Sequence, residues 1–432
     1  MEQHRAVVVG AGIGGLTTAV ALCARGWDVT VLERAADLAP VGAGIGLAPN
    51  ALRALDVIGL GAPVRELAAW QGDGGMRRPD GRWLARTDAR AAAARFGDPL
   101  VLLHRATLIG LLTAALPDGT VRTAAPAALA HPGDAARPAR VTTPDGELEA
   151  ELVVAADGIR SATRAALFPA HPGPRYSGHT TWRTVIPAPE RPFAPHETWG
   201  PGRLWGSQPL KDGRVYAYAM AAAPEGAHAP DGEKAVLERL FGGWHHPVPA
   251  ILAATEESAV LRHDVHHLID PLPAFHQGRT ALLGDAAHAM QPTLGQGGNQ
   301  AIEDAIVLAH HIGAGRQVPD ALAAYTADRL PRTTALVRKA ARTGRLALLS
   351  ARPAVALRDA AVTAVSRFGP GLVLRGFDGI ADWRPPTDGG PDAGRPDTGR
   401  PDTGRPAGSP TERQAGGPSG DSAGSTAHGR PA

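Results

Sequence analysis

This 432-residue sequence has a single cysteine, no excess of charge of either sign and no long hydrophobic run. The one cysteine, Cys23, excludes an intramolecular disulfide and any cysteine-based zinc or iron–sulfur site. Lys and Arg (44) nearly balance Asp and Glu (42), and a net charge of +2 gives no case for nucleic-acid binding. Because no stretch approaches 18 consecutive apolar residues, no transmembrane segment is expected.

The first residues enter an apolar segment, Ala6-Val-Val-Val, without room for a signal peptide, so we expect a reduced, cytoplasmic protein. The segments 5–10 and 28–33 are predicted buried strands that flank a helix over about 13–26, which is a βαβ unit. Between about 175 and 275, short alternating segments with Trp and Tyr predict a mostly antiparallel sheet. The fold class is α/β: a Rossmann-like domain, an inserted β-sheet substrate domain and C-terminal helices.

The predicted domain boundaries follow from this division. The dinucleotide-binding domain takes 1–70, 100–175 and 276–320, and the substrate domain takes 71–99 and 176–275. A helical region covers 321–383. From 384 to 432 the sequence is rich in Pro and Gly, repeats with a period of five and lacks large apolar residues, so we expect disorder there.

A glycine-rich turn follows the first predicted strand. It reads Gly10-Ala-Gly12-Ile13-Gly14-Gly15, opens a helix, and is followed by Glu33 at the end of the second strand. In this context the pattern is the dinucleotide fingerprint: Gly10 makes the turn, Gly12 admits a pyrophosphate, and Gly15 lets helix and strand pack. Glu33 would accept from ribose hydroxyls, and Arg34 is either an adenine contact or a surface residue. NAD and FAD share this motif.

A second, more specific pattern lies near the end of the α/β region. A predicted strand ends in Gly284-Asp285, and a loop with His288 and Pro292 leads to a glycine-rich helix start, Gly295-Gln-Gly297-Gly298-Asn299. Asp285 stands at the edge where open α/β sheets bind ligands, and could accept from a hydroxyl group of a bound cofactor. The free N–H groups of the helix start would stabilise negative charge on such a cofactor.

Together these motifs resemble the class A (single-component) flavoprotein monooxygenases of the para-hydroxybenzoate hydroxylase superfamily, in the branch of salicylate, 3-hydroxybenzoate and urate hydroxylases. The resemblance covers residues 5–383. It implies that the loop 41–50 with Gly44 passes over the flavin, that Arg105 reaches FAD, and that Asp157-Gly158 serves FAD and NAD(P)H.

The implied reaction uses bound FAD, transient NADPH or NADH, and O2. One oxygen atom would pass from a flavin C4a-hydroperoxide to a small aromatic or apolar substrate. Candidates to line the substrate site, with His288 and Pro292 beside the flavin, are Arg183, Trp199, Trp205, Gln208, Tyr216 and Tyr218. Of these, Arg183, Tyr216, His288 and Pro292 are the predicted catalytic residues. No base for a phenolic substrate is identified, and no histidine pair forms a metal-ligand pattern.

Several alternatives stay open at this point. The flavin reading competes with an FAD-dependent reductase without oxygen transfer, an NAD-dependent dehydrogenase, and a flavoprotein that only binds. Glu303 and Asp304 are expected to be helix-start carboxylates. The basic run from Arg329 to Arg345 is expected to be a solvated or self-associating face, and the alternative is contact with a NADPH phosphate or a membrane surface. A homodimer is the possible assembly. Thr184, where the family often has Gly, is expected to narrow the substrate region or to shift the strand.

Overall fold

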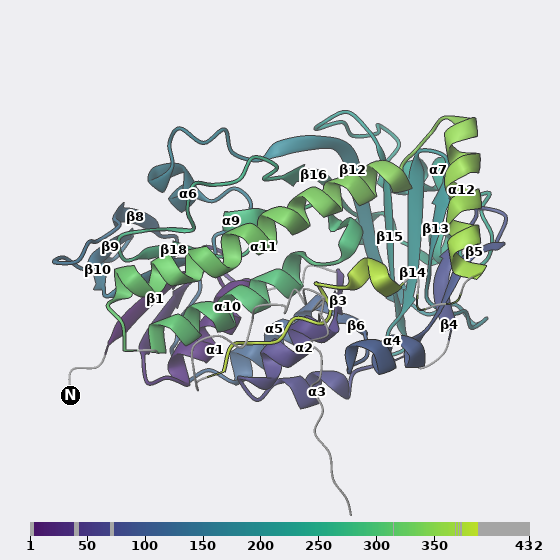
Figure 1. The fold of residues 1–432 in the computed structure, drawn as a ribbon. Coiled ribbons are helices and arrows are strands. Elements are labelled where there is room, and N and C mark those ends of the chain that lie inside the picture. Colours follow the sequence, from purple (N-terminus) through teal and green to yellow (C-terminus); the bar gives the residue numbers. More distant parts are fainter. Residues whose placement is uncertain are drawn as a thin grey trace, which may run out of the picture. The chain divides into compact units, whose positions relative to one another are not determined.

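The computed structural model describes residues 4–38, 43–69, 73–313, 315–367, 369, 371 and 374–387. The predicted disordered tail lies outside the described residues from 388 onward, as do Val41 and Gly42 of the predicted flavin loop. The first unit of the chain, 1–390, contains all the elements below (Figure 1).

A six-stranded sheet, counted over the described residues, carries the two predicted motifs. In spatial order its strands are β17 (His276–Gln277), β18 (Thr280–Leu282), β11 (Leu152–Ala155), β1 (Arg5–Val9), β2 (Asp28–Leu32) and β7 (Val121–Arg122). All neighbours pair in parallel except β17 with β18. Helix α1 (Ile13–Cys23) connects β1 to β2, which confirms the βαβ unit. Strands such as Val7-Val8-Val9 are apolar throughout because both faces of this parallel sheet are covered.

Helices and a small sheet cover the two faces. One face packs against α1, α2 (Pro49–Asp56), α5 (Arg105–Ala114) and α10 (Gly297–Gly313). The other packs against an antiparallel sheet of β8 (Ala128–His131), β9 (Ala139–Thr143) and β10 (Gly146–Ala150). The ribbon β3 (Gly44–Leu47) and β6 (Val101–His104) leads into α2 and α5. Short helices complete this part: α3 (Gly61–Arg65), α6 (Ala162–Leu167), α9 (Asp285–His288) and η2 (Pro292–Leu294).

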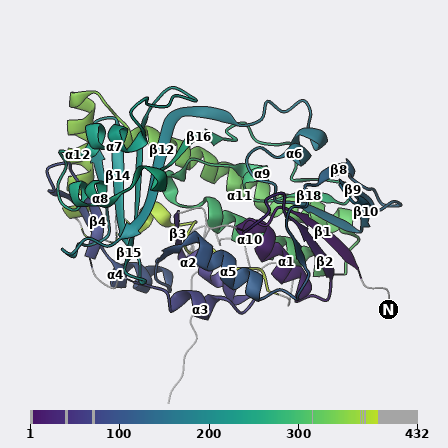
Figure 2. The ribbon, with the colours of Figure 1, turned by 180° about the vertical axis from the view of Figure 1, so that it is seen from behind.

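A seven-stranded sheet, again over the described residues, lies beside this part of the chain (Figure 1 and Figure 2). In spatial order it contains β16 (Leu261–His267), β12 (Arg175–Pro187), β15 (Arg214–Ala222), β14 (Arg203–Pro209), β13 (His196–Gly200), β4 (Asp73–Arg77) and β5 (Trp83–Asp88). Only the pair β13–β4 is parallel, which confirms the mostly antiparallel sheet. Helices α7 (Glu233–Phe241) and α8 (Val248–Ala254) cover one face, over Trp182 and Trp205 (Figure 2).

Long helices follow the sheets. Helix α11 (Val318–Ala347) contacts β17 near its start, and Ala347 and Leu348 at its end pack on Leu204 of the seven-stranded sheet (Figure 1). Helix α12 (Arg352–Arg367) lies against β5, α4 (Ala89–Phe96) precedes β6, and the one-turn helices η1 (Glu257–Ala259) and η3 (Arg375–Phe377) occupy loops. The α/β fold class with C-terminal helices is therefore confirmed, whereas the domain boundaries stay a prediction.

Two negative observations hold for the described ranges. None of their helices has the length and apolar character needed to cross a membrane. Likewise, these residues contain no group of three or more His, Cys, Asp and Glu side chains placed to hold a metal ion.

A buried histidine in the seven-stranded sheet makes the fold sensitive to acid. Burial lowers the pKa of His196 from 6.5 to about 4, helped by His245 and Arg77 and opposed by its hydrogen bond to the Ala194 carbonyl. The unfolded chain therefore takes up a proton as pH falls below 6.5, while the folded chain takes it up only near pH 4, so stability falls across this window. The shift corresponds to about 3 kcal/mol.

We therefore expect the free energy of unfolding to decline less between pH 7 and pH 4.5 in His196→Gln than in the unchanged protein, by about 2 to 3 kcal/mol. Urea titrations at the two pH values measure this difference. His228→Gln is the matched control, because His228 is an exposed residue whose ring pairs with Glu233. Equal pH dependence in His196→Gln and the unchanged protein would refute the assignment.

Candidate functional site

Two glycines of the first motif are fixed by backbone packing. Gly10 has a φ of +102°, and a Cβ placed on it would lie 2.5 Å from the Ala156 carbonyl oxygen. A Cβ on Gly15 would lie 2.0 Å from the Gly10 carbonyl oxygen. Any side chain at either position would collide with backbone, so the turn between β1 and α1 requires both glycines.

Two further predicted site glycines serve packing between elements. A Cβ on Gly14 would lie 2.5 Å from a methyl of Leu283, and one on Gly298 would lie 2.7 Å from Cδ1 of Ile45. The buried side chain of Ile13 also lies near Gly298. These glycines bring α1, α10 and β3 close together, and the motif is therefore partly a packing motif.

Gly12 faces a cluster of charged side chains. The nearest atom to a Cβ on Gly12 is Nη2 of Arg105 at 4.0 Å, and the nearest to one on Gly297 is Oδ1 of Asp285 at 3.9 Å. Burial lowers the pKa of Arg105, with Asp285 acting in the opposite direction and Arg183 adding to the effect. The structure thus brings together five predicted site residues that come from five different elements: Gly12, Arg105, Arg183, Asp285 and Gly297.

Glu33 holds the glycine-rich loop from the end of β2. Its Oε2 accepts from the backbone N–H of Ala11 (2.8 Å), and its Oε1 accepts from that of Ala35 (2.9 Å). The carboxylate therefore stands beside the first turn, where the fingerprint requires it. Arg34 is exposed.

The Asp157-Gly158 turn follows β11 at the same edge of the sheet. Oδ2 of Asp157 accepts from the N–H of Thr163 (3.2 Å). Its Oδ1 is buried and has no hydrogen-bond partner among the described residues. Gly158 has a φ of +76°, with open space where a Cβ would be. An unpaired buried carboxylate oxygen needs a donor, and a bound ligand with hydroxyl groups would supply one.

Gly284 presents Asp285 through a conformation that a side chain could not adopt. Its φ of 62° and ψ of −135° lie in a region open only to glycine. The Gly284 N–H donates to Oδ2 of Asp304 (3.0 Å), and this hydrogen bond anchors the turn to α10. Asp285 is exposed, although the residues on both sides of it are buried.

Asn299 clamps the glycine-rich turn to β3. Its Oδ1 accepts from the Ala48 N–H (2.8 Å), and its Nδ2 donates to the carbonyls of Gly46 (2.9 Å) and Gly295 (2.7 Å). The side chain is therefore fully used by backbone groups, so cofactor contact at this position falls to the backbone. Gly295 has a φ of 62° and follows Pro292, which is exposed at the start of η2.

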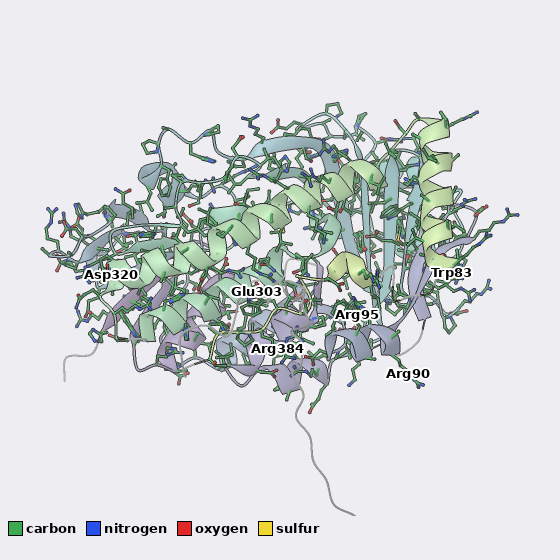
Figure 3. The ribbon with its side chains drawn as sticks, in the orientation of Figure 1. Trp83, Arg90, Arg95, Glu303, Asp320 and Arg384 are labelled. Carbon is green, nitrogen blue, oxygen red and sulfur yellow. The ribbon has the colours of Figure 1, made fainter. Side chains whose placement is uncertain are left out.

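A buried charge network behind this turn was not predicted. Arg329 of α11 donates to Asp304 Oδ1 and Glu303 Oε2, both at 2.6 Å, and Arg332 donates to Glu303 (2.8 Å) (Figure 3 labels Glu303). Asn50 joins Glu303 to Gln296 in the glycine-rich turn.

The network corrects two expectations. Glu303 and Asp304 lie in the interior of α10, fully buried, and are not helix-start carboxylates. Arg329 is 1% exposed, so the basic run is not uniformly a solvated face. Burial alone would raise the pKa of Asp304, but His288 and Arg329 hold it at about 2, so this carboxylate stays charged. The sequence did contain a signal for this network: the acidic pair Glu303-Asp304 stands about 25 positions before Arg329, which lies in the next helix.

His288 belongs to this network. Its Nε2 lies 2.5 Å from Oδ2 of Asp304, its ring packs near Phe275, and it is 3% exposed. This geometry favours a structural role, so the catalytic role stays a prediction that the packing does not support.

One face of the seven-stranded sheet carries Arg183 and Tyr216. We call it the flavin-side face, because β3, which belongs to the predicted flavin loop, packs on it. Gly44 of β3 packs directly on this face, since a Cβ there would lie 2.4 Å from the Tyr216 ring. The side chains of Gln208 and Tyr218 share the face, because Gln208 pairs with Tyr216 and Tyr218 with Arg183. Four of the predicted substrate-lining residues therefore share the sheet face on which β3 packs.

The two tryptophan candidates lie on opposite faces of this sheet. Trp205 points into the core under α7 and α8. Trp199 lies on the face of Tyr218, with which it shares the Glu197 carboxylate, but it is 8% exposed and packs against Leu204 and Met220. Thr184 alternates with Arg183 along β12 and lies on the opposite face, beside Ala217. It therefore does not narrow the substrate region, and that part of the expectation was wrong, whereas a shift of the strand stays a prediction.

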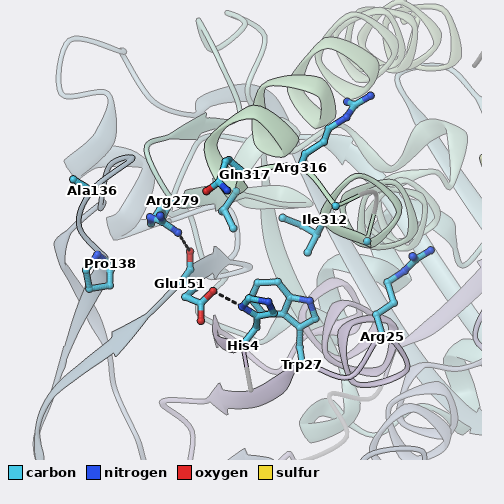
Figure 4. A pocket seen from close by; sticks show the side chains of 13 residues that line it. His4, Arg25, Trp27, Ala136, Pro138, Glu151, Arg279, Ile312, Arg316 and Gln317 are labelled. Atoms are coloured by element: carbon cyan, nitrogen blue, oxygen red, sulfur yellow. Dashed lines mark hydrogen bonds and ion pairs between the residues drawn. The ribbon is translucent and has the colours of Figure 1, made fainter. Parts of the chain in front are cut away.

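A pocket of about 580 Å³ lies at the other end of the six-stranded sheet (Figure 4). Its lining includes His4, Trp27 and Glu151, which precede β1, β2 and β11. Because these strands are parallel, that end is opposite the edge where Gly10, Glu33 and Asp157 stand. The pocket is therefore separate from the candidate site.

The residues at the carboxyl edge fit a dinucleotide cofactor. Gly12 leaves the backbone open beside Arg105, Asp157 offers an unpaired buried oxygen, and Asp285 stands exposed on a fixed turn. FAD would be held by these groups, with its phosphates at the N-terminus of α1.

Comparisons with known proteins agree with this geometry. A family described as FAD binding domain matches residues 3–340. The aurachin C monooxygenase/isomerase of Stigmatella aurantiaca is 39% identical over 344 residues, 79% of this chain and 88% of that protein. The 3-amino-4-hydroxybenzoate 2-monooxygenase PtnB3 of Streptomyces platensis is 37% identical over 399 residues, 87% of this chain and 97% of that protein. The crystal structure of Klebsiella pneumoniae HpxO with FAD and uric acid has a TM-score of 0.79 and 28% identity, covering 88% of this chain and 96% of that one.

Fold and site thus define an FAD-binding enzyme with one Rossmann-like sheet. The chain belongs to the FAD-binding-domain family and, within it, to the class A flavoprotein monooxygenases. FAD is its cofactor and it is a monooxygenase, as predicted from the motifs.

Proposed function

We propose that the protein uses NAD(P)H and O2 to insert one oxygen atom into an aromatic substrate that carries an acidic group. The observation that carries this proposal is Arg183. Its guanidinium has no ion-pair partner within the described residues, and it lies near Arg105 and Tyr216 on the flavin-side face. An arginine so placed suits a carboxylate or another planar anion.

The relatives support the same chemistry. One is named for 3-amino-4-hydroxybenzoate, and a similar structure holds uric acid. Both compounds are aromatic or heteroaromatic and acidic. Two predicted guanidinium groups, Arg105 and Arg183, lie close enough to interact, and they favour an acidic member of the predicted aromatic substrates.

The chain's own residues have defined tasks in this proposal. Arg183 binds the acidic group, Tyr216 packs beside the ring, and Asp285 with the α10 start orients the cofactor. FAD, when bound, supplies the reduction by NAD(P)H and the oxygen transfer. NADPH versus NADH, a cytoplasmic location and a homodimer stay predictions.

The proposal is tested by adding hydroxybenzoates, aminobenzoates and purines to the FAD-loaded protein. We expect one of these to stimulate NAD(P)H oxidation and to yield a product heavier by one oxygen atom. With that substrate, Arg183→Gln should raise KM about 10- to 100-fold, the size of one lost charge-assisted hydrogen bond. Arg175→Gln, on the same strand but paired with Asp270, is the control. Oxidation without oxygen incorporation for every compound would overturn the proposal.

A further inference from the structure

His263 lies on the same sheet face as Arg183. Strand β16 pairs antiparallel with β12, with His263 opposite Thr181 and Leu261 opposite Arg183. Side chains alternate along each strand, so residues 261 and 263 share a face with 181 and 183. The imidazole is exposed on this face.

The other face of the same strands confirms this orientation. Trp182 donates to Glu233 of α7 (2.7 Å), and Arg262 lies 3.8 Å from the same carboxylate. Since these neighbours point toward α7, Arg183 and His263 must point away from it, toward the flavin side. That side also carries Tyr216, which Gly44 contacts.

The charges around His263 favour a neutral ring. The packed neighbours desolvate part of the ring and so lower the pKa of His263; Arg183 on β12, Arg105 on α5 and Arg262 on its own strand lower it further, while Asp264 opposes them. No hydrogen bond to either ring nitrogen is found among the described residues. The ring therefore holds a free acceptor nitrogen near neutral pH.

The other acid–base groups near this face are engaged or less exposed. His179, two residues before Thr181 on β12, is only partly exposed, with Nδ1 unpaired among the described residues, and His267 beside it is buried. Both oxygens of Glu197 accept hydrogen bonds, from Tyr218 (2.7 Å) and Trp199 (2.8 Å). His288 is buried against Asp304. In the described part of the chain, His263 is thus the exposed imidazole on the face that carries Arg183.

We propose that His263 is the proton acceptor for the substrate's acidic O–H or N–H group. The substrate's bond to hydrogen breaks, an N–H bond forms on the imidazole, and the electron pair stays on the substrate as an anion. Arg183 and Arg105 stabilise that anion, and the exposed ring passes the proton to water. An electron-rich anion is the form of an aromatic ring that accepts an electrophilic oxygen best. This inference rests on the proposed function, because it needs an acidic aromatic substrate.

The test compares His263→Gln with His266→Gln in the FAD-loaded protein. His266 is on the same strand, on the opposite face, where its Nε2 meets Glu225 (2.8 Å). With the substrate found above, His263→Gln should lower kcat/KM about 100-fold and remove the loss of rate that acid causes in the unchanged protein. His266→Gln should keep both the rate and the pH profile.

A binding measurement tests the same step without turnover. We expect 4-nitrophenol, whose phenolate is coloured, to ionise on the unchanged protein at a pH about one unit or more below that on His263→Gln. Equal ionisation together with equal pH profiles would overturn the role of His263 and leave the proposed function standing. Failure of every substrate on the unchanged protein would overturn both.

Discussion

Asp304→Ala is expected to lose both FAD and much of its stability. Asp304 is fully buried and accepts from Arg329, Gly284 and His288. Its removal leaves a buried guanidinium without one partner and a buried N–H without any, and breaking such a pair costs about 3 to 5 kcal/mol. The Gly284 turn, which presents Asp285 to the cofactor, loses its anchor at the same time.

Flavin absorbance per protein and the midpoint of thermal unfolding measure these effects. The control is Asp328→Ala, one position before Arg329 on α11, where an exposed carboxylate meets His311. A pair with one exposed partner is expected to cost under about 1 kcal/mol. If Asp304→Ala kept the flavin content and melting temperature of Asp328→Ala, the anchoring role would be refuted.

Asp304→Asn separates two roles of this side chain: the hydrogen bond that anchors the Gly284 turn and the charge that pairs with Arg329. An asparagine can still accept from the Gly284 N–H through its amide oxygen, but it offers no charge to Arg329. We expect flavin content to recover more than stability does. Equal flavin loss in Asp304→Asn and Asp304→Ala would mean that charge, and not the turn anchor, controls cofactor binding.

Gly44→Ala is expected to displace Tyr216 from the substrate face. The added methyl would lie 2.4 Å from the Tyr216 ring and 2.8 Å from its Cβ, so the ring or β3 must move. Overpacking of this kind costs about 1 to 3 kcal/mol. Substrate-stimulated NAD(P)H oxidation should fall with it, because Tyr216 packs beside the substrate in the proposed site.

A double variant distinguishes this clash from a general loss of stability. In Gly44→Ala/Tyr216→Ala the ring is gone, so the combined cost should be smaller than the sum of the two single costs. Gly46→Ala is the control on the same strand, since its nearest neighbour is the flexible Leu102 side chain at 3.3 Å. Additive costs for the pair would show that Gly44 does not act through Tyr216.

Local patterns were sufficient to predict the cofactor edge. Gly10 and Glu33 directly follow β1 and β2, Asp285 begins the turn that follows β18, and parallel strands place their carboxyl ends at one edge. The strand and helix periods therefore located these residues before any packing was known. The same reasoning predicted that Asn299 binds the cofactor, whereas its side chain forms hydrogen bonds with backbone groups next to and within β3.

Contacts between distant segments could not be predicted in this way. Arg329 belonged to a basic run that looked solvated, and only its approach to Glu303 and Asp304 on α10 made it a buried partner. Thr184 and Arg183 are neighbours in sequence, yet the pleat places them on opposite faces. The proposed substrate base, His263, could not be identified from the sequence, because only the register between β12 and β16 brings it to the face of Arg183.

The sequence by itself thus determined the family of this protein, its fold class and its FAD cofactor, because turns, strands and glycines act over a few residues. Tertiary structure decided which charges are buried, which face each sheet residue takes, and which histidine is free to accept a proton. Those properties depend on burial and on pairing between strands and helices far apart in the chain, and both arise only when the chain has folded.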